Sequence, residues 1–421
     1  MQLTPEEAFA GAMARLLPAQ SSSPMPSLGL AVSGGGDSMA LTWIAHRWAR
    51  ERGVALHLAT VDHGLRPQAA AEAADVAAFA ARLGLSHDTL HWRGWDGRGN
   101  LQDAARRARR RLLSAWAGER GLGAVLIAHT ADDQAETFLL RLARGSGVDG
   151  LSAMREARRE AGLLWLRPLL RVRREALREL LRRQGIGWAE DPSNADPRYD
   201  RVRMRQALPA LGALGLTVER LSDTAARLAE ARDALAVQAA LAARRLLRVE
   251  AGDVLVDLAG LAAEPVEIRA RLLSAALCWV SSAEYRPRRA ALDRLSADLA
   301  RGTGGSLHGC LVTERHGVAR IGREPQAVLG LRCAAPGVWD HRWRLFGPDC
   351  DELEIGALGP GGLSQRPRWR ESGLPRRTLL AQPALWQGQR LIAVPVLEPG
   401  GAWRAELLGG ADAFHSSLIP H

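Results

Sequence analysis

The chain has 421 residues, of which 47% are hydrophobic and 24% are charged, a balance typical of a folded globular protein. Because this length exceeds what one ordinary core accommodates, we expect two or three domains. No run of about 18 uninterrupted apolar residues occurs, and Glu6 and Glu7 stand where a secretory signal would be basic. We therefore predict a cytoplasmic protein with no membrane partner.

The formal net charge is +10, and all the basic residues are arginine because the sequence contains no lysine. Arginine forks suit bidentate contacts with phosphate and stack on bases, which favours a nucleic-acid partner. Biased codon usage could also explain why arginine replaces lysine throughout, so the arginine content by itself favours a nucleic-acid partner only modestly. The four cysteines (Cys278, Cys310, Cys333 and Cys350) form no Cys-x-x-Cys pair, so the sequence indicates neither a zinc site nor a redox motif.

The first part of the chain alternates apolar runs with helical patterns. The apolar runs cover residues 28–32, 54–61, 86–92 and 124–128. The helical patterns that follow them cover residues 39–52, 68–83, 101–120 and 132–143. This alternation predicts an α/β domain with a parallel, doubly wound sheet, in which ligands bind beyond the carboxyl ends of the strands. Three of the four runs end in polar clusters, SGGGDS, DHGLR and AHTADDQAE, which we expect to form the site.

The later chain predicts additional domains. Leucines 221, 228 and 235 recur at heptad spacing in a helical stretch at 218–247, which is more typical of a packed helix than of a coiled coil. Beyond residue 325 glycine and proline become frequent, and runs such as 390–397 resemble short strands. We therefore predict a catalytic domain with a helical appendage at 1–213, a mainly helical domain at 214–325 and a small α+β domain at 326–421.

Residues 33–38, SGGGDS, predict a phosphate-binding loop. The glycines allow close approach of the backbone, and the start of a helix favours an anion. Asp37 would repel bare phosphate, but it suits a Mg²⁺ ion placed between it and a pyrophosphate. The absence of lysine excludes a Walker loop, and no glycine follows Ser38 at the spacing of a dinucleotide fingerprint. The simpler alternative, a glycine-rich turn with an Asp cap, does not explain the complete string after a buried strand.

Residues 129–137, HTADDQAET, form the second constellation. Asp132 and Glu136 are four apart and share one helix face, so the pair could bind Mg²⁺ or move a proton with His129 beside it. Acids at a helix start are also favoured by the helix dipole alone. Because His129 stands beside this carboxylate pair, and two other predicted strands also end in polar clusters, a functional site is favoured over this simpler explanation.

The loop SGGGDS resembles the PP-loop of the ATP pyrophosphatases, which cleave ATP to AMP and pyrophosphate while adenylating a substrate oxygen. Residues 129–147, from His129 to the string Arg-Gly-Ser-Gly, are similar to the signature of the tRNA(Ile)-lysidine synthases. Residues 62–66, 100–109, 167–170, 188–194 and 199–205 follow in that family's order, and residues 373–396 resemble its C-terminal RNA-binding domain. Gln102, Arg110 and Val202 depart from the glutamate, tyrosine and asparagine common there.

The resemblance implies the reaction. ATP adenylates the C2 carbonyl oxygen of the first anticodon cytidine of tRNA(Ile) with a CAU anticodon, and free L-lysine then displaces AMP to give lysidine. ATP and Mg²⁺ are the implied cofactors, and a homodimer is left open. The implied ATP-binding residues are Ser33, Gly34, Gly35, Gly36, Asp37 and Ser38, with Asp37 and Asp132 as metal ligands. The implied catalytic residues are Asp37, Arg106, Arg109, His129, Asp132 and Glu136. The implied tRNA contacts are Arg203, Arg205, Arg368, Trp369, Arg376 and Arg377.

Three alternatives compete with this interpretation. A tRNA 2-thiolation enzyme of the same family usually needs a cysteine or an iron–sulfur cluster in the PP-loop domain, whereas every cysteine here lies beyond residue 277. A small-molecule amide synthetase would not need the several arginine-rich segments and extra domains. A catalytically inactive RNA-binding protein would not need three polar strand ends beside a PP-loop, unless it descends from an active enzyme.

Overall fold

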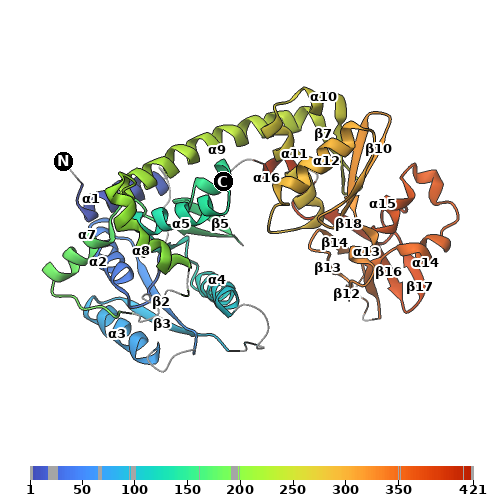
Figure 1. Ribbon diagram of the computed structural model, residues 1–421. Helices are drawn as coiled ribbons and strands as arrows, with labels where there is room; N and C mark the ends of the chain where they lie inside the picture. The colour runs from blue at the N-terminus through green and yellow to red at the C-terminus, as the bar shows by residue number, and fades with distance from the viewer. Residues whose placement is uncertain are drawn as a thin grey trace. The chain divides into compact units, whose positions relative to one another are not determined.

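The computed structural model describes residues 3–17, 27–64, 69–93, 95, 101–160, 162–190, 198, 200–348, 350, 352–410 and 412–418. They form two compact units, residues 1–232 and residues 233–420, whose elements are labelled in Figure 1. The motif positions 65–66, 100, 191–194 and 199 lie outside the described residues. The division into three domains at residues 213 and 325 stays a prediction.

The first unit is built on a six-stranded sheet of order β3-β2-β1-β4-β6-β5. Five strands run parallel, and β5 pairs with β6 in the antiparallel sense at one edge. The strands are β1 (Leu28–Ala31), β2 (Leu56–Asp62), β3 (Ser86–His91), β4 (Ala124–Ile127), β5 (Ala157–Glu160) and β6 (Leu163–Leu166). The predicted parallel sheet is therefore confirmed, and the antiparallel edge strand is an addition to it.

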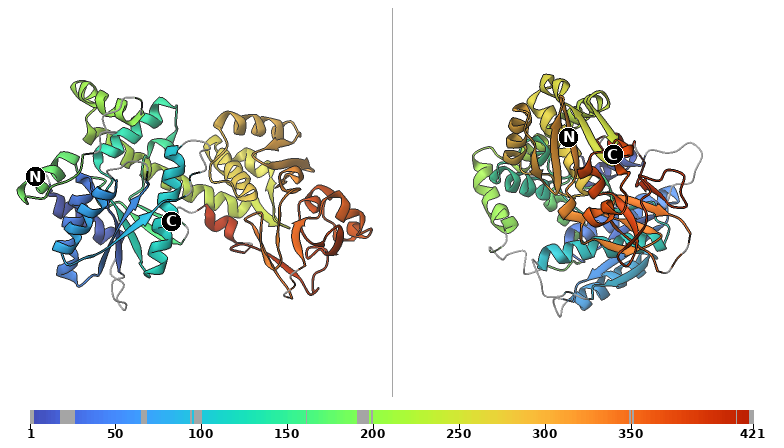
Figure 2. Two further views of the ribbon diagram at one scale, coloured as in Figure 1. Left: turned by 90° about the horizontal axis from the view of Figure 1, so that it is seen from below. Right: turned by 90° about the vertical axis from the view of Figure 1, so that its right-hand side faces the viewer.

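Helices cover both faces of this sheet (Figure 2). Leu28 and Leu30 of β1 face one core, while the alternate residue Ala31 faces the other. Gly29 also lies on the second face, where an added Cβ would stand 2.7 Å from Cζ3 of Trp116. The first core is covered by α1 (Pro5–Leu16), α2 (Gly36–Arg52), α3 (Ala69–Arg82) and α7 (Arg174–Arg183), and the second by α4 (Leu101–Glu119).

A third core in the first unit supports the helix that follows β4. Phe138 and Leu139 pack in this core with Leu221 and Leu228, whereas Leu235 packs against a core of the second unit, so the heptad leucines belong to a packed helix. The helix after β4 starts with a capping box, in which the side chains of Thr130 and Asp133 accept from each other's backbone N–H. The helices are α5 (Ala131–Ala143), α6 (Val148–Leu151), α8 (Asp200–Ala213) and α9 (Val218–Leu246).

The beginning of the second unit is rich in helix, as predicted, and also contains a five-stranded antiparallel sheet of order β7-β8-β11-β10-β9. The sheet was not anticipated, although the turn between β10 and β11 carries His316 and Gly317, both with positive φ. The helices are α10 (Leu258–Ala263), α11 (Val266–Ser281) and α12 (Arg289–Ala300). The strands are β7 (Leu247–Glu250), β8 (Asp253–Asp257), β9 (Gly305–Leu307), β10 (Cys310–Arg315) and β11 (Val318–Arg323).

The end of the chain has the small α+β character that the sequence predicts, with sheets of order β12-β15-β16-β17 and β13-β14-β18. The strands are β12 (Arg332–Ala334), β13 (Gly337–Trp339), β14 (Trp343–Phe346), β15 (Glu354–Ala357), β16 (Pro383–Gln387), β17 (Arg390–Ala393) and β18 (Arg404–Leu407). The helices are α13 (Pro325–Val328), α14 (Gly359–Ser364), the 3₁₀ turn η2 (Trp369–Ser372), α15 (Arg376–Leu380) and α16 (Ala413–Ser417). Within the described ranges, no helix has the length and apolar character needed to cross a membrane.

Candidate active site

The glycine-rich loop leaves β1 and starts α2, as the sequence predicts. Gly34 has φ +82°, a left-handed conformation that favours glycine, and its carbonyl accepts from the N–H of Ala189 at 2.9 Å. The Ser38 hydroxyl donates to the Gly35 carbonyl at 2.9 Å and accepts from the Ser33 N–H at 3.2 Å. These bonds hold the loop closed around the start of α2, where the first backbone N–H groups of a helix have no partner within the helix and attract anions.

Arg174, at the first position of α7, joins the loop to α5. Its Nε donates to Oδ2 of Asp37 at 3.0 Å. Its Nη2 donates to Oδ1 of Asp133 at 2.9 Å, and its Nη1 donates to Oε1 of Glu136 at 3.4 Å. Its backbone N–H donates to Oδ2 of Asp132 at 2.8 Å. The structure thus brings Asp37, Asp132 and Glu136 together around Arg174, a residue that the sequence analysis did not single out.

Two further arginines complete the ion pairs of α5. Arg205 of α8 donates from Nε to Oε1 of Glu136 at 2.8 Å, and Arg173 contacts Asp132 at 3.3 Å and also pairs with Glu219. The side chain of Glu136 is 0% exposed, and among the described residues its Oε2 has no hydrogen-bond partner. Arg205, which we predicted as a tRNA contact, therefore lies in this cluster.

The protonation states of Asp37 and Asp133 depend on their burial and on the positive charge of Arg174. Burial raises the pKa of Asp37 above its ordinary value, although the Arg174 guanidinium opposes the shift. Burial would also raise the pKa of Asp133, but Arg174 and the hydrogen bonds from Thr130 outweigh it and hold this pKa below the usual range. Burial would lower the pKa of Arg174, yet its carboxylate partners raise it. Arg174 is therefore a permanent cation.

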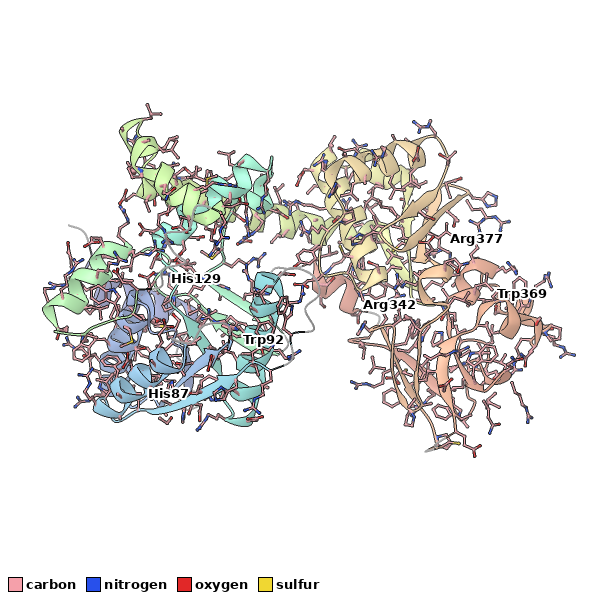
Figure 3. All side chains as sticks on the ribbon, turned by 60° about the horizontal axis from the view of Figure 1, so that its bottom comes forward. His87, Trp92, His129, Arg342, Trp369 and Arg377 are labelled. Carbon is pink, nitrogen blue, oxygen red and sulfur yellow. The ribbon has the colours of Figure 1, made fainter. Side chains whose placement is uncertain are left out.

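His129 stands beyond the carboxyl end of β4, in the first unit (Figure 3). Burial lowers its pKa to about 3, and the positive charges of Arg167, Arg201 and Arg109 act in the same direction. Arg167 donates from Nε to Nδ1 of His129 at 3.1 Å, so Nδ1 is the acceptor nitrogen. The imidazole is therefore neutral at physiological pH and carries its proton on Nε2.

The arginines of α4 contribute a positive surface beside this histidine. Burial and the neighbouring charge of Arg106 lower the pKa of Arg109. Burial, with Arg110, Arg158 and Arg106, lowers the pKa of Arg167 to about 10. An anion bound beside these arginines would relieve their mutual repulsion. Arg109, predicted as catalytic, thus lies in the electrostatic surroundings of His129, and Arg106, also predicted as catalytic, acts on Arg109 and Arg167.

Two of the three positions that depart from the family pattern have visible structural surroundings. Arg110 forms an ion pair with Glu160 of β5 at 3.2 Å. Val202 is buried on α8, where it is 6% exposed. The side chain of Gln102 lies outside the described part of the chain.

The remaining tRNA candidates are Arg203 of α8 in the first unit and four residues of the second unit. Arg203 is exposed and pairs with Asp200. In the second unit, Arg376 and Arg377 are exposed at the start of α15, and Arg377 and Trp369 are labelled in Figure 3. The candidate Arg368 is 86% exposed. Trp369 packs partly against the core of this region, with the guanidinium of Arg370 4.5 Å from its ring centroid.

Comparison with known proteins decides the family. A model of the PP-loop domain matches residues 7–211. The chain is 47% identical over 401 residues to the tRNA(Ile)-lysidine synthase of Ruegeria pomeroyi, covering 95% of this chain and 96% of that protein. This chain belongs to the tRNA(Ile)-lysidine synthase family. The lysidine synthase of Bradyrhizobium sp. strain BTAi1 is 42% identical over 322 residues, covering 71% of this chain and 90% of that protein.

A similar solved structure is the U34-tRNA thiolase NcsA from Methanococcus maripaludis, with 15% identity and a TM-score of 0.45 over 54% of this chain and 80% of that one. The family assignment does not depend on this structure. Membership of the lysidine synthase family confirms the resemblance that the PP-loop and the signature after β4 indicated. The sequence alone did not single out Arg173 and Arg174, because they lie among many other arginines and no motif marks them.

Proposed function

We propose that this chain ligates free L-lysine to C2 of the first anticodon cytidine of tRNA(Ile) with a CAU anticodon, consuming ATP and releasing AMP and pyrophosphate. The observation that carries the proposal is the 47% identity to a tRNA(Ile)-lysidine synthase over 95% of this chain. The closed phosphate loop beside Asp37 and the carboxylates of α5 support the same chemistry, since adenylation needs both phosphate binding and charge compensation.

ATP binding begins at the phosphate loop. The start of α2 and the loop residues 33–38 would receive the phosphates, with the Ser33 hydroxyl as an added donor. Among the described residues, no group of three or more His, Cys, Asp or Glu side chains is placed to hold a metal ion. Mg²⁺ in nucleotide sites typically takes one or two carboxylates and completes its shell with phosphate oxygens and water. Asp37 and Asp132 fit that need, and the ion would neutralise charge on the departing pyrophosphate.

Adenylation of the cytidine makes its C2 oxygen a good leaving group. The oxygen attacks the α-phosphorus of ATP, the bond to the pyrophosphate breaks, and the cytidine is joined to AMP. Arg106 and Arg109 of α4 would balance the negative charge of this adenylate. His129, neutral and protonated at Nε2, would act as a hydrogen-bond donor and not as a cationic acid.

Attack by lysine completes the reaction. The amine forms a bond to C2, the bond between C2 and the activated oxygen breaks, and AMP leaves. The attacking nitrogen must lose a proton, for which we assign Glu136 as the acceptor. Its Oε1 is held by Arg174 and Arg205, whereas its Oε2 lacks a partner among the described residues. Oε2 is buried in this structure, so this role requires that the amine or a bridging water molecule reaches it when the substrates are bound.

Binding of the tRNA would use exposed arginines of both units. The exposed candidates are Arg203 on α8 and Arg368, Arg376 and Arg377 in the second unit, because guanidinium groups suit phosphate contacts. Arg205, the other predicted contact on α8, is only partly exposed and pairs with Glu136. Trp369 offers only part of its ring, since the rest is packed. A thiolation enzyme is not favoured: the relatives are lysidine synthases, and burial raises the pKa values of Cys278 and Cys310, which makes both poor nucleophiles.

The test is incubation of the full chain with ATP, Mg²⁺, labelled lysine and unmodified tRNA(Ile) bearing a CAU anticodon. Acid-stable label in the tRNA, with release of AMP and pyrophosphate, is the expected result. If ATP is cleaved only in the presence of tRNA but no label is transferred, the adenylation chemistry stands and the nucleophile is a molecule other than lysine. If ATP is not cleaved at all, the remaining interpretation is a catalytically inactive RNA-binding protein.

A further inference from the structure

We propose that Arg174 is a positioning residue for the adenylation step, which holds Asp37 at the start of α2 in register with the carboxylates of α5. The inference rests on the proposed function, because it assigns a role within that reaction. The hydrogen bonds of the guanidinium go to carboxylates and not to the backbone of the phosphate loop. Arg174 would therefore act through Asp37 and not by contact with the reacting atoms.

The geometry of the guanidinium supports this role. Its three nitrogen atoms each donate to a different carboxylate, namely those of Asp37, Asp133 and Glu136. Asp37 is separated from Arg174 by 137 positions in the chain, whereas Asp133 and Glu136 belong to one helix. Arg174 therefore joins two elements that leave the sheet from different strands. A planar fork fixes both distance and direction at once, which a lysine ammonium does not.

The backbone of Arg174 is anchored independently of its side chain. Its N–H donates to Oδ2 of Asp132 at 2.8 Å, as α7 begins. Leu177, Leu180 and Leu181 of the same helix are buried in the main core of the first unit. The side chain is thus projected from a rigid element and is only 16% exposed. Removing the guanidinium should consequently leave α7 in place while releasing Asp37.

Charge explains why a cation is needed at this point. Asp37, Asp132, Asp133 and Glu136 gather around one position, and like charges this close repel one another. Within the described part of the chain, Arg173 pairs with Asp132 and Glu219, and Arg205 pairs with Glu136. Arg174 is the cation that these contacts place on Asp37. Without it, Asp37 would be pushed away from α5, and the charge that it places against the phosphates would shift.

This role predicts a specific kinetic pattern. The backbone N–H groups of the loop remain when Arg174 is replaced, so ground-state binding of ATP should persist. A misplaced Asp37 affects the departing pyrophosphate in the transition state, and an error of about 1 Å in a reacting group costs on the order of 100-fold in rate. The loss should therefore fall on kcat and spare KM for ATP.

The experiment measures tRNA-dependent pyrophosphate release by the full chain and its Arg174→Met, Arg174→Lys and Arg174→Gly variants. Arg183→Met on the same helix, at an exposed position, is the matched control. We expect Arg174→Met to lower kcat about 100-fold with little change in KM for ATP. Arg174→Lys should recover only part of this loss, and the control should match the wild type. Added guanidinium chloride, at concentrations that leave the wild type unaffected, should raise the rate of Arg174→Gly.

Three results would overturn the inference: a wild-type kcat in Arg174→Met, full recovery in Arg174→Lys, or failure of guanidinium to raise the rate of a folded Arg174→Gly. Thermal unfolding of each variant identifies any that does not fold. If one variant is unfolded, the activities of the folded variants test the role of Arg174. Label transfer by the wild type tests the proposed function separately. A wild type that cleaves ATP without transferring lysine would refute that function, while the ratio of variant to wild-type cleavage still tests Arg174.

Discussion

Arg167 donates a hydrogen bond from Nε to Nδ1 of His129 at 3.1 Å, which fixes the tautomer of the imidazole next to the carboxylates of α5. Arg167 is itself held by a bond from Nη1 to the carbonyl of Arg155 at 3.0 Å. A permanent cation beside Nδ1 disfavours protonation of the ring. The histidine that looked like a candidate acid or base in the sequence is therefore a fixed, neutral donor.

The first prediction concerns the protonation of His129. Its folded pKa of about 3 lies below the ordinary value of 6.5, so between these values the unfolded chain binds a proton that the folded chain does not. The stability due to this group is therefore complete above about pH 6.5 and declines as the pH falls toward 3. Nitrogen NMR of labelled histidine should show His129 neutral, with its proton on Nε2, from pH 8 to about pH 5. A ring that titrates near pH 6.5 would contradict this assignment.

The second prediction concerns Asp37. Replacement by asparagine keeps the shape of the side chain but removes the charge that, in the proposed function, faces the phosphates and Mg²⁺. Pyrophosphate release should fall below about 1% of the wild-type rate, while tRNA affinity, measured by filter binding, stays unchanged. Removal of Mg²⁺ with a chelator should have the same effect on the wild type. Loss of tRNA binding together with activity would instead indicate misfolding.

The third prediction compares two glycines of the first unit. A Cβ at Gly29 would lie 2.7 Å from Trp116, whereas a Cβ at Gly118 of α4 would meet nothing within 4 Å. Gly29→Ala should lower the free energy of unfolding by about 1–3 kcal/mol through overpacking. Gly118→Ala should raise it by about 0.5–1 kcal/mol, because alanine is the better helix former. Urea denaturation of both variants measures the difference, and equal effects would show that the strand does not pack against Trp116 as described.

The fourth prediction concerns the stability contributed by Glu136. Its side chain is 0% exposed and accepts from Arg174 and Arg205. Glu136→Ala would leave both cations without this partner and should cost about 3 kcal/mol. Glu175→Ala, which removes an exposed ion pair with Arg182, should change stability by less than about 1 kcal/mol. Chemical denaturation compares the two, and a similar small loss in both would mean that Glu136 is not paired as described.

The fifth prediction tests tRNA contacts in the second unit. Arg376 and Arg377 are exposed and lie side by side in sequence. If both contact phosphates, the double change to glutamine should weaken tRNA binding and reduce the slope of log affinity against log salt by about 1–2. Arg301→Gln, which removes an exposed partner of Asp298, should leave the slope unchanged. An unaltered slope in the double variant would remove both arginines from the interface.

Local patterns in the sequence determined the architecture of the first unit and the position of its site. The alternation of apolar runs and helical patterns predicted strands such as β1 and β4 and helices such as α5. Both kinds of element follow from the period at which side chains recur, which is a local property. The carboxyl ends of parallel strands meet at one edge, so the order of the motifs was enough to assign SGGGDS and the segment after β4 to one site. The five-stranded sheet of the second unit was missed, because its strands are short and interrupt helix-rich sequence.

Tertiary structure alone decided the charges within that site. Nothing near Arg174 in the sequence distinguishes it from the arginines around it, yet packing of α7 brings it to Asp37, 137 positions away. Arg205, which was predicted as an RNA contact, also pairs with Glu136, and burial together with Arg167 keeps His129 neutral. Ion pairing and pKa depend on distance in space and on exclusion of water. These quantities exist only once separate segments have packed, so the residue types could be read from the sequence while their electrostatic roles could not.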